Sequence, residues 1–203
     1  DDAIGNASAQ ELREMFIEGL PLSAKPCMPV KLIDHVLPSK FGDLIIREYC
    51  PNQSSITSPI LYFHGGGYVF GGIESHDAWL QFFSAEIGAK IFSLDYRLAP
   101  ENKFPSALQD ANHAIEWLGK KLNIQVKEIS VCGDSAGGHL ATSLSTNRAI
   151  NKLELPKSQC LIYPMTDPKC DSKSHKDFAN GFLLSHKAMI WFWEQLQESS
   201  ANL

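Results

Sequence analysis

Short apolar runs alternate along the chain with longer segments in which apolar residues recur at helical spacing. Runs of the first kind, which predict strands buried on both faces of a sheet, occupy 59–63, 90–95, 128–132 and 159–164. Segments of the second kind, which predict amphipathic helices, occupy 77–88, 104–122 and 136–149. Because predicted strands and helices alternate along the chain, the pattern indicates an α/β fold with a mostly parallel central sheet.

The two ends of the chain differ from this alternating middle. Residues 8–20 predict a helix that opens with the capping-box pattern Ser8-x-x-Glu11. Two strand-like segments follow a proline-punctuated connector, at 31–36 and 44–49. After the last apolar run, we expect a polar loop at 167–180 and a final amphipathic helix at 186–197.

Composition narrows the class of protein. With 203 residues, 44% hydrophobic and 20% charged, the chain can bury one sizeable core. The net charge of −5, without a basic run, gives no electrostatic reason to expect nucleic-acid binding. No apolar stretch approaches the roughly 20 residues of a membrane span. No His, Cys, Asp or Glu pair has metal-ligand spacing on a regular element, so we expect no metal site.

The cysteines lack the pattern of a disulfide framework. There are five, an odd number without a C-x-x-C pair: Cys27, Cys50, Cys132, Cys160 and Cys170. This favours a reducing compartment, and we expect a cytoplasmic protein. Cys132 and Cys160 fall in apolar runs, which predicts that both are buried small side chains.

Residues 133–137 read Gly-Asp-Ser-Ala-Gly and fit the pattern G-x-S-x-G between a strand and a helix. A serine at the tip of such a sharp turn is crowded by the residues two before and two after it, and glycine relieves the crowding because it has no Cβ. By background frequencies the pattern arises by chance in about one chain in fifteen of this length. An ordinary glycine-rich turn is therefore the alternative interpretation.

His64-Gly65-Gly66-Gly67 is the rarer signal, expected by chance in roughly one such chain per thousand. It follows the apolar run 59–63 and precedes the serine turn. Three glycines allow backbone N–H groups to point into one small space, where they can stabilise an oxyanion. A phosphate-binding loop is the alternative, but no lysine follows and the pattern is not G-x-G-x-x-G.

The order of these motifs, with Asp95-Tyr96-Arg97-Leu98-Ala99-Pro100-Glu101 between them, resembles the hormone-sensitive-lipase-like esterases. The resemblance implies an α/β-hydrolase fold with a helical lid and no cofactor or metal. It further implies a lid helix and connector at 1–43, a core at 44–166 and a second lid segment at 167–203. It implies that Ser135 is the nucleophile and that the oxyanion donors are the amides of Gly66, Gly67 and Ala136. It assigns supporting roles to His64, Gly65 and Asp134. It also suggests that Asp95 and Arg97 brace the structure beneath the site.

The sequence departs from this family where the general base and its orienting acid should follow the serine. One helix, one strand, the polar loop and the last helix fill the stretch after Ser135, and two more βαβ units of about 30 residues each cannot fit there. We therefore expect the last strands of the fold, with the catalytic Asp and His, to lie outside this chain, on a complementary C-terminal fragment. His139, His175 and His186 are poor substitutes by their positions.

Two functions remain open on the sequence alone. The first is a carboxylic ester hydrolase that forms an acyl-enzyme on short to medium acyl esters, here without its acid and base. The second is a non-catalytic, receptor-like protein that binds a small molecule on the same fold. Candidate pocket residues are Phe16, Tyr68, Phe70, Phe182 and Leu183, although such side chains are more often plain core.

Overall fold

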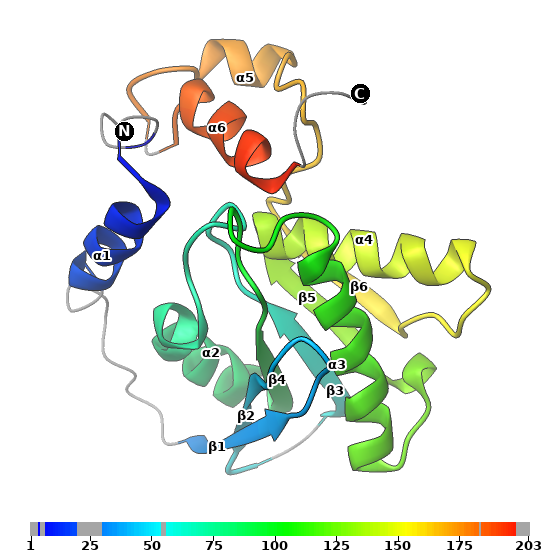
Figure 1. Cartoon of the computed structure of the whole chain (residues 1–203). Helices are drawn as coiled ribbons and strands as arrows, with labels where there is room; N and C mark the ends of the chain where they lie inside the picture. The colour runs from blue at the N-terminus through cyan, green and yellow to red at the C-terminus, as the bar shows by residue number, and fades with distance from the viewer. Residues whose placement is uncertain (1–3, 5–6, 20–29, 54–55, 183, 198–203) are drawn as a thin grey trace.

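A computed structural model of the chain describes residues 4, 7–19, 30–53, 56–182 and 184–197. Its centre is a six-stranded sheet in the order β1-β2-β4-β3-β5-β6 (Figure 1). The strands are β1 (Val30–Leu37), β2 (Leu44–Pro51), β3 (Ile56–Phe63), β4 (Ala89–Asp95), β5 (Ser130–Asp134) and β6 (Ser158–Ile162). The helices are α1 (Ala9–Gly19), α2 (Ile73–Ile87), α3 (Ser106–Leu122), α4 (Ala136–Ile150), α5 (Lys173–Asp177) and α6 (His186–Leu196).

The sheet is mixed, with its parallel part at the centre and at one edge. Strands β4, β3, β5 and β6 run parallel, whereas β1 and β2 form an antiparallel hairpin that joins β4. The predicted α/β-hydrolase fold with a mostly parallel sheet is therefore confirmed. Strand β1 lies within 1–43, the stretch expected to form a lid helix and connector, and it is hydrogen-bonded to β2 along its length.

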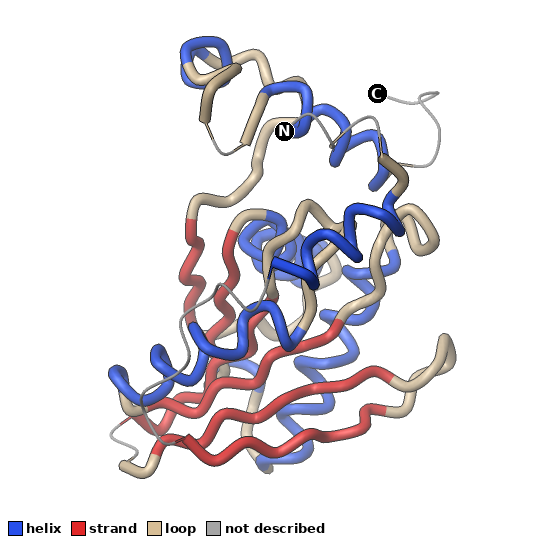
Figure 2. The backbone as a smooth tube through the Cα atoms, turned by 90° about the vertical axis from the view of Figure 1, so that its left-hand side faces the viewer, coloured by secondary structure: helices blue, strands red, loops and turns tan. Residues whose placement is uncertain are grey.

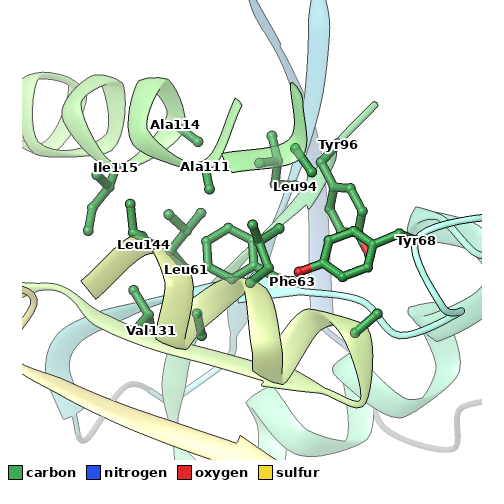
Figure 3. Packing of buried hydrophobic residues seen from close by; sticks show 14 of the residues in the cluster. Leu61, Phe63, Tyr68, Leu94, Tyr96, Ala111, Ala114, Ile115, Val131 and Leu144 are labelled. Carbon is green, nitrogen blue, oxygen red and sulfur yellow. The ribbon is translucent and has the colours of Figure 1, made fainter. Parts of the chain in front are cut away.

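Helices cover both faces of the sheet (Figures 1 and 2). Helices α3 and α4 pack on one face over a core that includes Leu61, Phe63, Phe92, Ile115 and Leu144, all fully buried (Figure 3). Helix α2 covers the opposite face over a smaller cluster of Tyr49, Tyr62, Leu80, Ile91 and Cys132. Alternate residues of the central strands thus face opposite layers, which is why the strands read as continuous apolar runs.

Helices α5 and α6 lie above the carboxyl ends of the parallel strands, and α1 lies beside them (Figure 1). The predicted capping box of α1 is present, since Ser8 N donates to Glu11 Oε2 at 2.7 Å and Glu11 N to Ser8 Oγ at 3.3 Å. Arg13 then ties α1 to the core by donating to the carbonyls of Val69 and Ala99. No helix in the described ranges is long and apolar enough to cross a membrane.

Several element boundaries differ from the sequence prediction. Helix α2 begins at Ile73, four residues earlier than expected, because the Ser75 hydroxyl accepts a hydrogen bond from Gly72 N at 3.0 Å and organises its first turn. Helix α3 begins at Ser106, because Pro105 precedes it with non-helical dihedral angles. The expected loop at 167–180 contains the short helix α5, whose start is capped by the Ser172 hydroxyl.

The strand predicted at 159–164 is present as β6, but the prediction that it is buried was wrong. Strand β6 ends at Ile162, and residues 158–161 are exposed, including Cys160. In the described part of the chain β6 pairs with β5 alone, so it is an edge strand with an open side. Apolar character along a strand does not report whether a neighbour covers it, and this is why the sequence misled.

The expected brace beneath the site is present for Arg97 and absent for Asp95. The Arg97 guanidinium contacts the carboxylate of Asp110, whose side chain is 2% exposed, at 2.8 Å, and Arg97 N donates to the same carboxylate at 3.0 Å. Asp95 is exposed and lines a cavity of about 400 Å³ together with Phe16 and Arg47. The end of β4 is thus anchored to α3 through Arg97.

The Arg97–Asp110 pair gives a stability prediction. Asp110→Ala should lower the free energy of unfolding by about 3 kcal/mol, because it leaves a largely buried guanidinium without its counter-ion. Lys127→Ala is the control, since Lys127 and Glu154 form an exposed pair 4.0 Å apart and its loss should cost less than about 1 kcal/mol. Urea unfolding followed by circular dichroism compares the two, and equal losses would contradict the assigned brace.

Candidate active site

Ser135 lies at the tip of a sharp turn between β5 and α4. Its dihedral angles, φ 52° and ψ −115°, are rarely adopted by a residue with a side chain and cost of order 1–3 kcal/mol. Besides the helical bond from His139 N to Ser135 O at 3.0 Å, two hydrogen bonds from outside α4 hold this conformation: Ser135 N donates to Ile162 O at 2.9 Å, and Met165 N donates to Ser135 O at 3.2 Å. The turn is therefore fixed from outside, by the segment at the end of β6.

The two glycines of the serine turn are required by close backbone approach. A Cβ on Gly133 would overlap the backbone of Gly137, and a Cβ on Gly137 would overlap the carbonyl group of Phe63. The N-terminus of α4 therefore crosses directly over β5 and β3. This is the crowding that the G-x-S-x-G spacing predicts.

The glycine loop lies beside the serine turn because β3 and β5 are parallel neighbours. Phe63 pairs with Gly133, so both loops leave the sheet at the same edge. Gly66 and Gly67 have φ values of 118° and 61°. A Cβ on Gly66 would overlap the carbonyl group of Phe70, and one on Gly67 would overlap the Phe192 ring of α6.

Three backbone N–H groups at this edge are free to bind a ligand. Among the described residues, the amides of Gly66, Gly67 and Ala136 donate no hydrogen bond to another protein group. Ala136 is the first residue of α4, where the helix dipole places partial positive charge. The arrangement can therefore stabilise negative charge next to Ser135.

Asp134 joins the two loops. Its Oδ1 accepts hydrogen bonds from Gly65 N at 2.9 Å and from the Tyr62 hydroxyl at 2.6 Å, and lies 3.2 Å from His76 Nε2. Burial alone would raise the pKa of Asp134, but the contacts with His76, Tyr62 and Gly65 outweigh it and hold the pKa below its usual value. The ionised carboxylate of Asp134, which directly precedes Ser135, thus holds the start of the glycine loop beside the serine turn.

His64 is buried in the floor of the glycine loop. Its ring stacks on Tyr96 with centroids 4.2 Å apart, and the Tyr96 hydroxyl donates to His64 O at 2.7 Å. Burial, followed by the charge of His76, lowers the pKa of His64 to about 4. Its Nδ1 is 2.7 Å from Gly65 O, so the neutral ring donates back into its own loop. His64 has the surroundings of a structural side chain.

None of the chain's seven histidines forms a hydrogen bond with the Ser135 hydroxyl. All seven lie in the described ranges, and each has another partner. His139 contacts Tyr68 through Nδ1 at 2.8 Å, His175 contacts Ser172 at 2.7 Å, and His186 contacts Cys170 O at 2.9 Å. The partners of the remaining four are Glu48 for His35, Gly65 for His64, Asp134 for His76 and Pro38 for His113.

Some residues around the site were not singled out from the sequence. Tyr62 and His76 contact Asp134, and Phe192 of α6 packs against Gly67. His76 lies on the first turn of the helix that follows the glycine loop, and this position is the only sequence signal for it. Tyr62 and Phe192 sit in apolar segments whose pattern predicts core and gives no indication of a site.

The predicted pocket side chains are scattered. Phe16 and Phe70 contact each other with ring centroids 4.8 Å apart, between α1 and the glycine loop. Tyr68 is buried and bonded to His139. Phe182 is exposed and packs on Phe178, away from these rings. Leu183 lies outside the described residues.

Comparison with known proteins gives the family. The model of the alpha/beta hydrolase fold matches residues 60–203. An ethyl acetate hydrolase of Pseudomonas putida is 36% identical over 196 residues, which cover 92% of this chain and 62% of the relative. An arylacetamide deacetylase of Bos taurus is 31% identical over 200 residues, covering 92% of this chain and 48% of the relative.

The structural comparison agrees. A thermostable carboxylesterase cloned from a metagenomic library superimposes with a TM-score of 0.83 at 36% identity, over 94% of this chain and 67% of that one. The chain spans about half to two thirds of the proteins that it matches. The chain belongs to the α/β-hydrolase family, in its hormone-sensitive-lipase-like branch of esterases.

Proposed function

We propose that this chain forms the nucleophile and oxyanion part of a serine carboxylesterase that cleaves short to medium acyl esters. The observation that carries the proposal is the hydrogen bond from Gly65 N to Asp134 Oδ1 at 2.9 Å. This bond joins Gly65, which directly precedes Gly66, to Asp134, which directly precedes Ser135, and so supports an assignment of Ser135 as the nucleophile and of the neighbouring amides as its oxyanion donors. No cofactor or metal takes part in this chemistry.

In this proposal the Ser135 hydroxyl attacks the ester carbonyl and forms a tetrahedral intermediate. The amides of Gly66, Gly67 and Ala136 stabilise its oxyanion. A general base takes the Ser135 proton and gives it to the leaving alcohol as the intermediate collapses to an acyl-enzyme, and a water activated by the same base then hydrolyses the acyl-enzyme to the free acid. The strained dihedral angles of Ser135 keep this residue outside both β5 and α4, at the turn between them. The supporting roles belong to His64 and Gly65, which shape the glycine loop, and to Asp134, which anchors it.

The general base and its orienting acid come, in this proposal, from a complementary C-terminal segment that carries a His and an Asp. The support is that all seven histidines of the chain are engaged elsewhere and that β6 has an open side. A further parallel strand on β6 would bring its carboxyl end to the edge at which Ser135 lies. We also assign α1 and the described residues of 167–197 to the lid, because Phe192 of α6 packs directly on the glycine loop and Arg13 of α1 donates to Val69 O beside that loop.

A small-molecule receptor on the same fold is the second candidate. It is favoured by the absence, among the described residues, of a base bonded to Ser135, and it requires only the amide donors of Gly66, Gly67 and Ala136. For either function we propose a cytoplasmic location, because the four described cysteines, Cys50, Cys132, Cys160 and Cys170, are free thiols.

The esterase proposal predicts that the isolated chain hydrolyses p-nitrophenyl butyrate at least about a thousandfold more slowly than a complete relative, because removal of a triad member costs several orders of magnitude. A chimaera that continues the chain with the C-terminal third of the Pseudomonas putida relative should recover hydrolysis. Ser135→Ala in the chimaera should abolish it. Initial rates of nitrophenolate release measure all three.

Hydrolysis by the isolated chain at a rate near that of the relative would place the base among the seven histidines and refute the role of the added segment. A cooperatively folded chimaera that binds p-nitrophenyl butyrate without turnover would refute the esterase and favour the receptor.

The anchoring role of Asp134 predicts a pH effect on stability. Its folded-state pKa is depressed, so its contribution is fully present above the unfolded value of about 4 and is lost as pH falls through the lower folded value. Asp134→Asn should therefore be less stable than wild type at pH 6, and the difference should shrink toward pH 3. Denaturant midpoints across this range give the comparison.

Asp171→Asn is the matched control, because the Asp171 side chain is exposed, away from the serine turn. It should follow the wild-type curve at every pH. If Asp134→Asn also followed that curve, Asp134 would not be an anchor held ionised by its neighbours.

A further inference from the structure

Tyr68 directly follows the glycine loop and is held at both its backbone and its side chain. Its φ of 65° is uncommon for a bulky residue, and such a conformation persists only where the surroundings impose it. The Tyr68 carbonyl accepts a hydrogen bond from Ala99 N at 2.8 Å, and the Tyr68 hydroxyl lies 2.8 Å from His139 Nδ1 on α4. Tyr68 is 3% exposed and packs beside the Tyr96 ring (Figure 3). It is thus a fixed point at the end of the glycine loop.

His139 is fixed in turn relative to Ser135. It lies four residues further along the chain, and its backbone N donates to Ser135 O at 3.0 Å. Its ring has Nε2 3.4 Å from Ser143 Oγ, one turn along α4, and meets the Trp193 ring of α6 edge-on, with centroids 5.1 Å apart. The ring therefore has little freedom to leave the Tyr68 hydroxyl.

The Tyr68–His139 pair is neutral near pH 7. Burial raises the pKa of Tyr68 and lowers the pKa of His139, so the hydroxyl keeps its proton and the imidazole ring carries one. With that proton on Nε2, toward Ser143, the Nδ1 atom accepts the hydrogen bond of the Tyr68 hydroxyl. His139 is then a partner of Tyr68, and its Nδ1 is occupied.

This contact holds the far end of the glycine loop. The start of the loop is held by Asp134, which accepts the hydrogen bond described above. The end is held by Tyr68 through His139. The two loop amides proposed as oxyanion donors, those of Gly66 and Gly67, lie between these two contacts.

We propose that Tyr68 and His139 are positioning residues, whose hydrogen bond holds the amides of Gly66 and Gly67 in place for the oxyanion formed at Ser135. Donors of this kind act only when they are aligned with the position at which charge develops. A loosened loop still binds the ester but stabilises the transition state less well, so the loss falls on kcat. This consequence rests on the proposed esterase function, whereas the contact itself does not.

The kinetic test uses the chimaera with the C-terminal third of the Pseudomonas putida relative and p-nitrophenyl butyrate. Tyr68→Phe should lower kcat about tenfold, less than the loss of a whole oxyanion donor, and leave KM within about twofold. His139→Ala should act in the same way. The double variant should lose no more than the worse single variant, because either change already removes the contact.

Tyr49→Phe is the matched control. It also removes a hydrogen bond from a buried tyrosine hydroxyl, to Asp77 Oδ1 of α2 at 3.0 Å, away from the glycine loop. Its stability loss should match that of Tyr68→Phe, and its kcat should equal that of the unmodified chimaera. In an active chimaera, an unchanged kcat in Tyr68→Phe, or an equal fall in Tyr49→Phe, would overturn the positioning role and leave the esterase standing.

Amide hydrogen exchange of the chain itself, followed by NMR, tests the contact without turnover. Val69 N and Phe70 N both donate to Gly66 O at 3.0 Å, so their exchange reports opening of the loop. Tyr68→Phe should speed both by about fivefold, the effect of one lost hydrogen bond, and Tyr49→Phe should speed neither. Unchanged exchange in Tyr68→Phe would overturn the proposal whether or not the chimaera is active. A chimaera without turnover would refute the esterase and the catalytic consequence together.

Discussion

One carboxylate holds the candidate site together. Asp134 accepts hydrogen bonds from Gly65 N and from the Tyr62 hydroxyl, and it lies within reach of His76. Desolvation disfavours a charge at this position, but the contacts with His76, Tyr62 and Gly65 outweigh it and keep the pKa of Asp134 below its usual value. The part-buried carboxylate therefore links the glycine loop to the serine turn through its hydrogen bond from Gly65 N.

The parallel sheet makes this contact possible. Because β3 and β5 are neighbours that run in the same direction, their carboxyl ends deliver the glycine loop and the serine turn to the same edge. Leu61 and Phe63 of β3 and Val131 of β5 pack in the same buried core as Leu144 of α4 (Figure 3). From the other side, the end of β6 holds the strained Ser135 backbone through Ile162 and Met165.

In the proposed site, donors for negative charge are present and a proton acceptor for Ser135 is not found among the described residues. The amides of Gly66, Gly67 and Ala136 donate to no described protein group, whereas each histidine contacts a residue other than Ser135. His64 illustrates the difference, because burial that lowers its pKa to about 4 makes it a neutral structural ring. Proton transfer at Ser135 therefore needs a group that the described residues do not provide.

The sequence by itself determined the class of the fold, the order of its strands and helices along the chain and the two motifs of the site. It could do so because these features depend on the spacing of residues close together in the chain. Examples are the apolar periodicity, the capping box at Ser8, and the glycines at positions where a Cβ would overlap a neighbouring backbone. The tertiary structure alone decided that Asp134 meets Tyr62 and His76, that Phe192 packs on Gly67, and that β6 is exposed. These contacts join residues far apart in the chain. The local sequence pattern does not indicate which distant residue a side chain will contact, or whether a strand has a neighbour on each side. Cys160 is an example: its apolar surroundings in the sequence predicted burial, and it is exposed on β6, which among the described residues pairs with β5 alone.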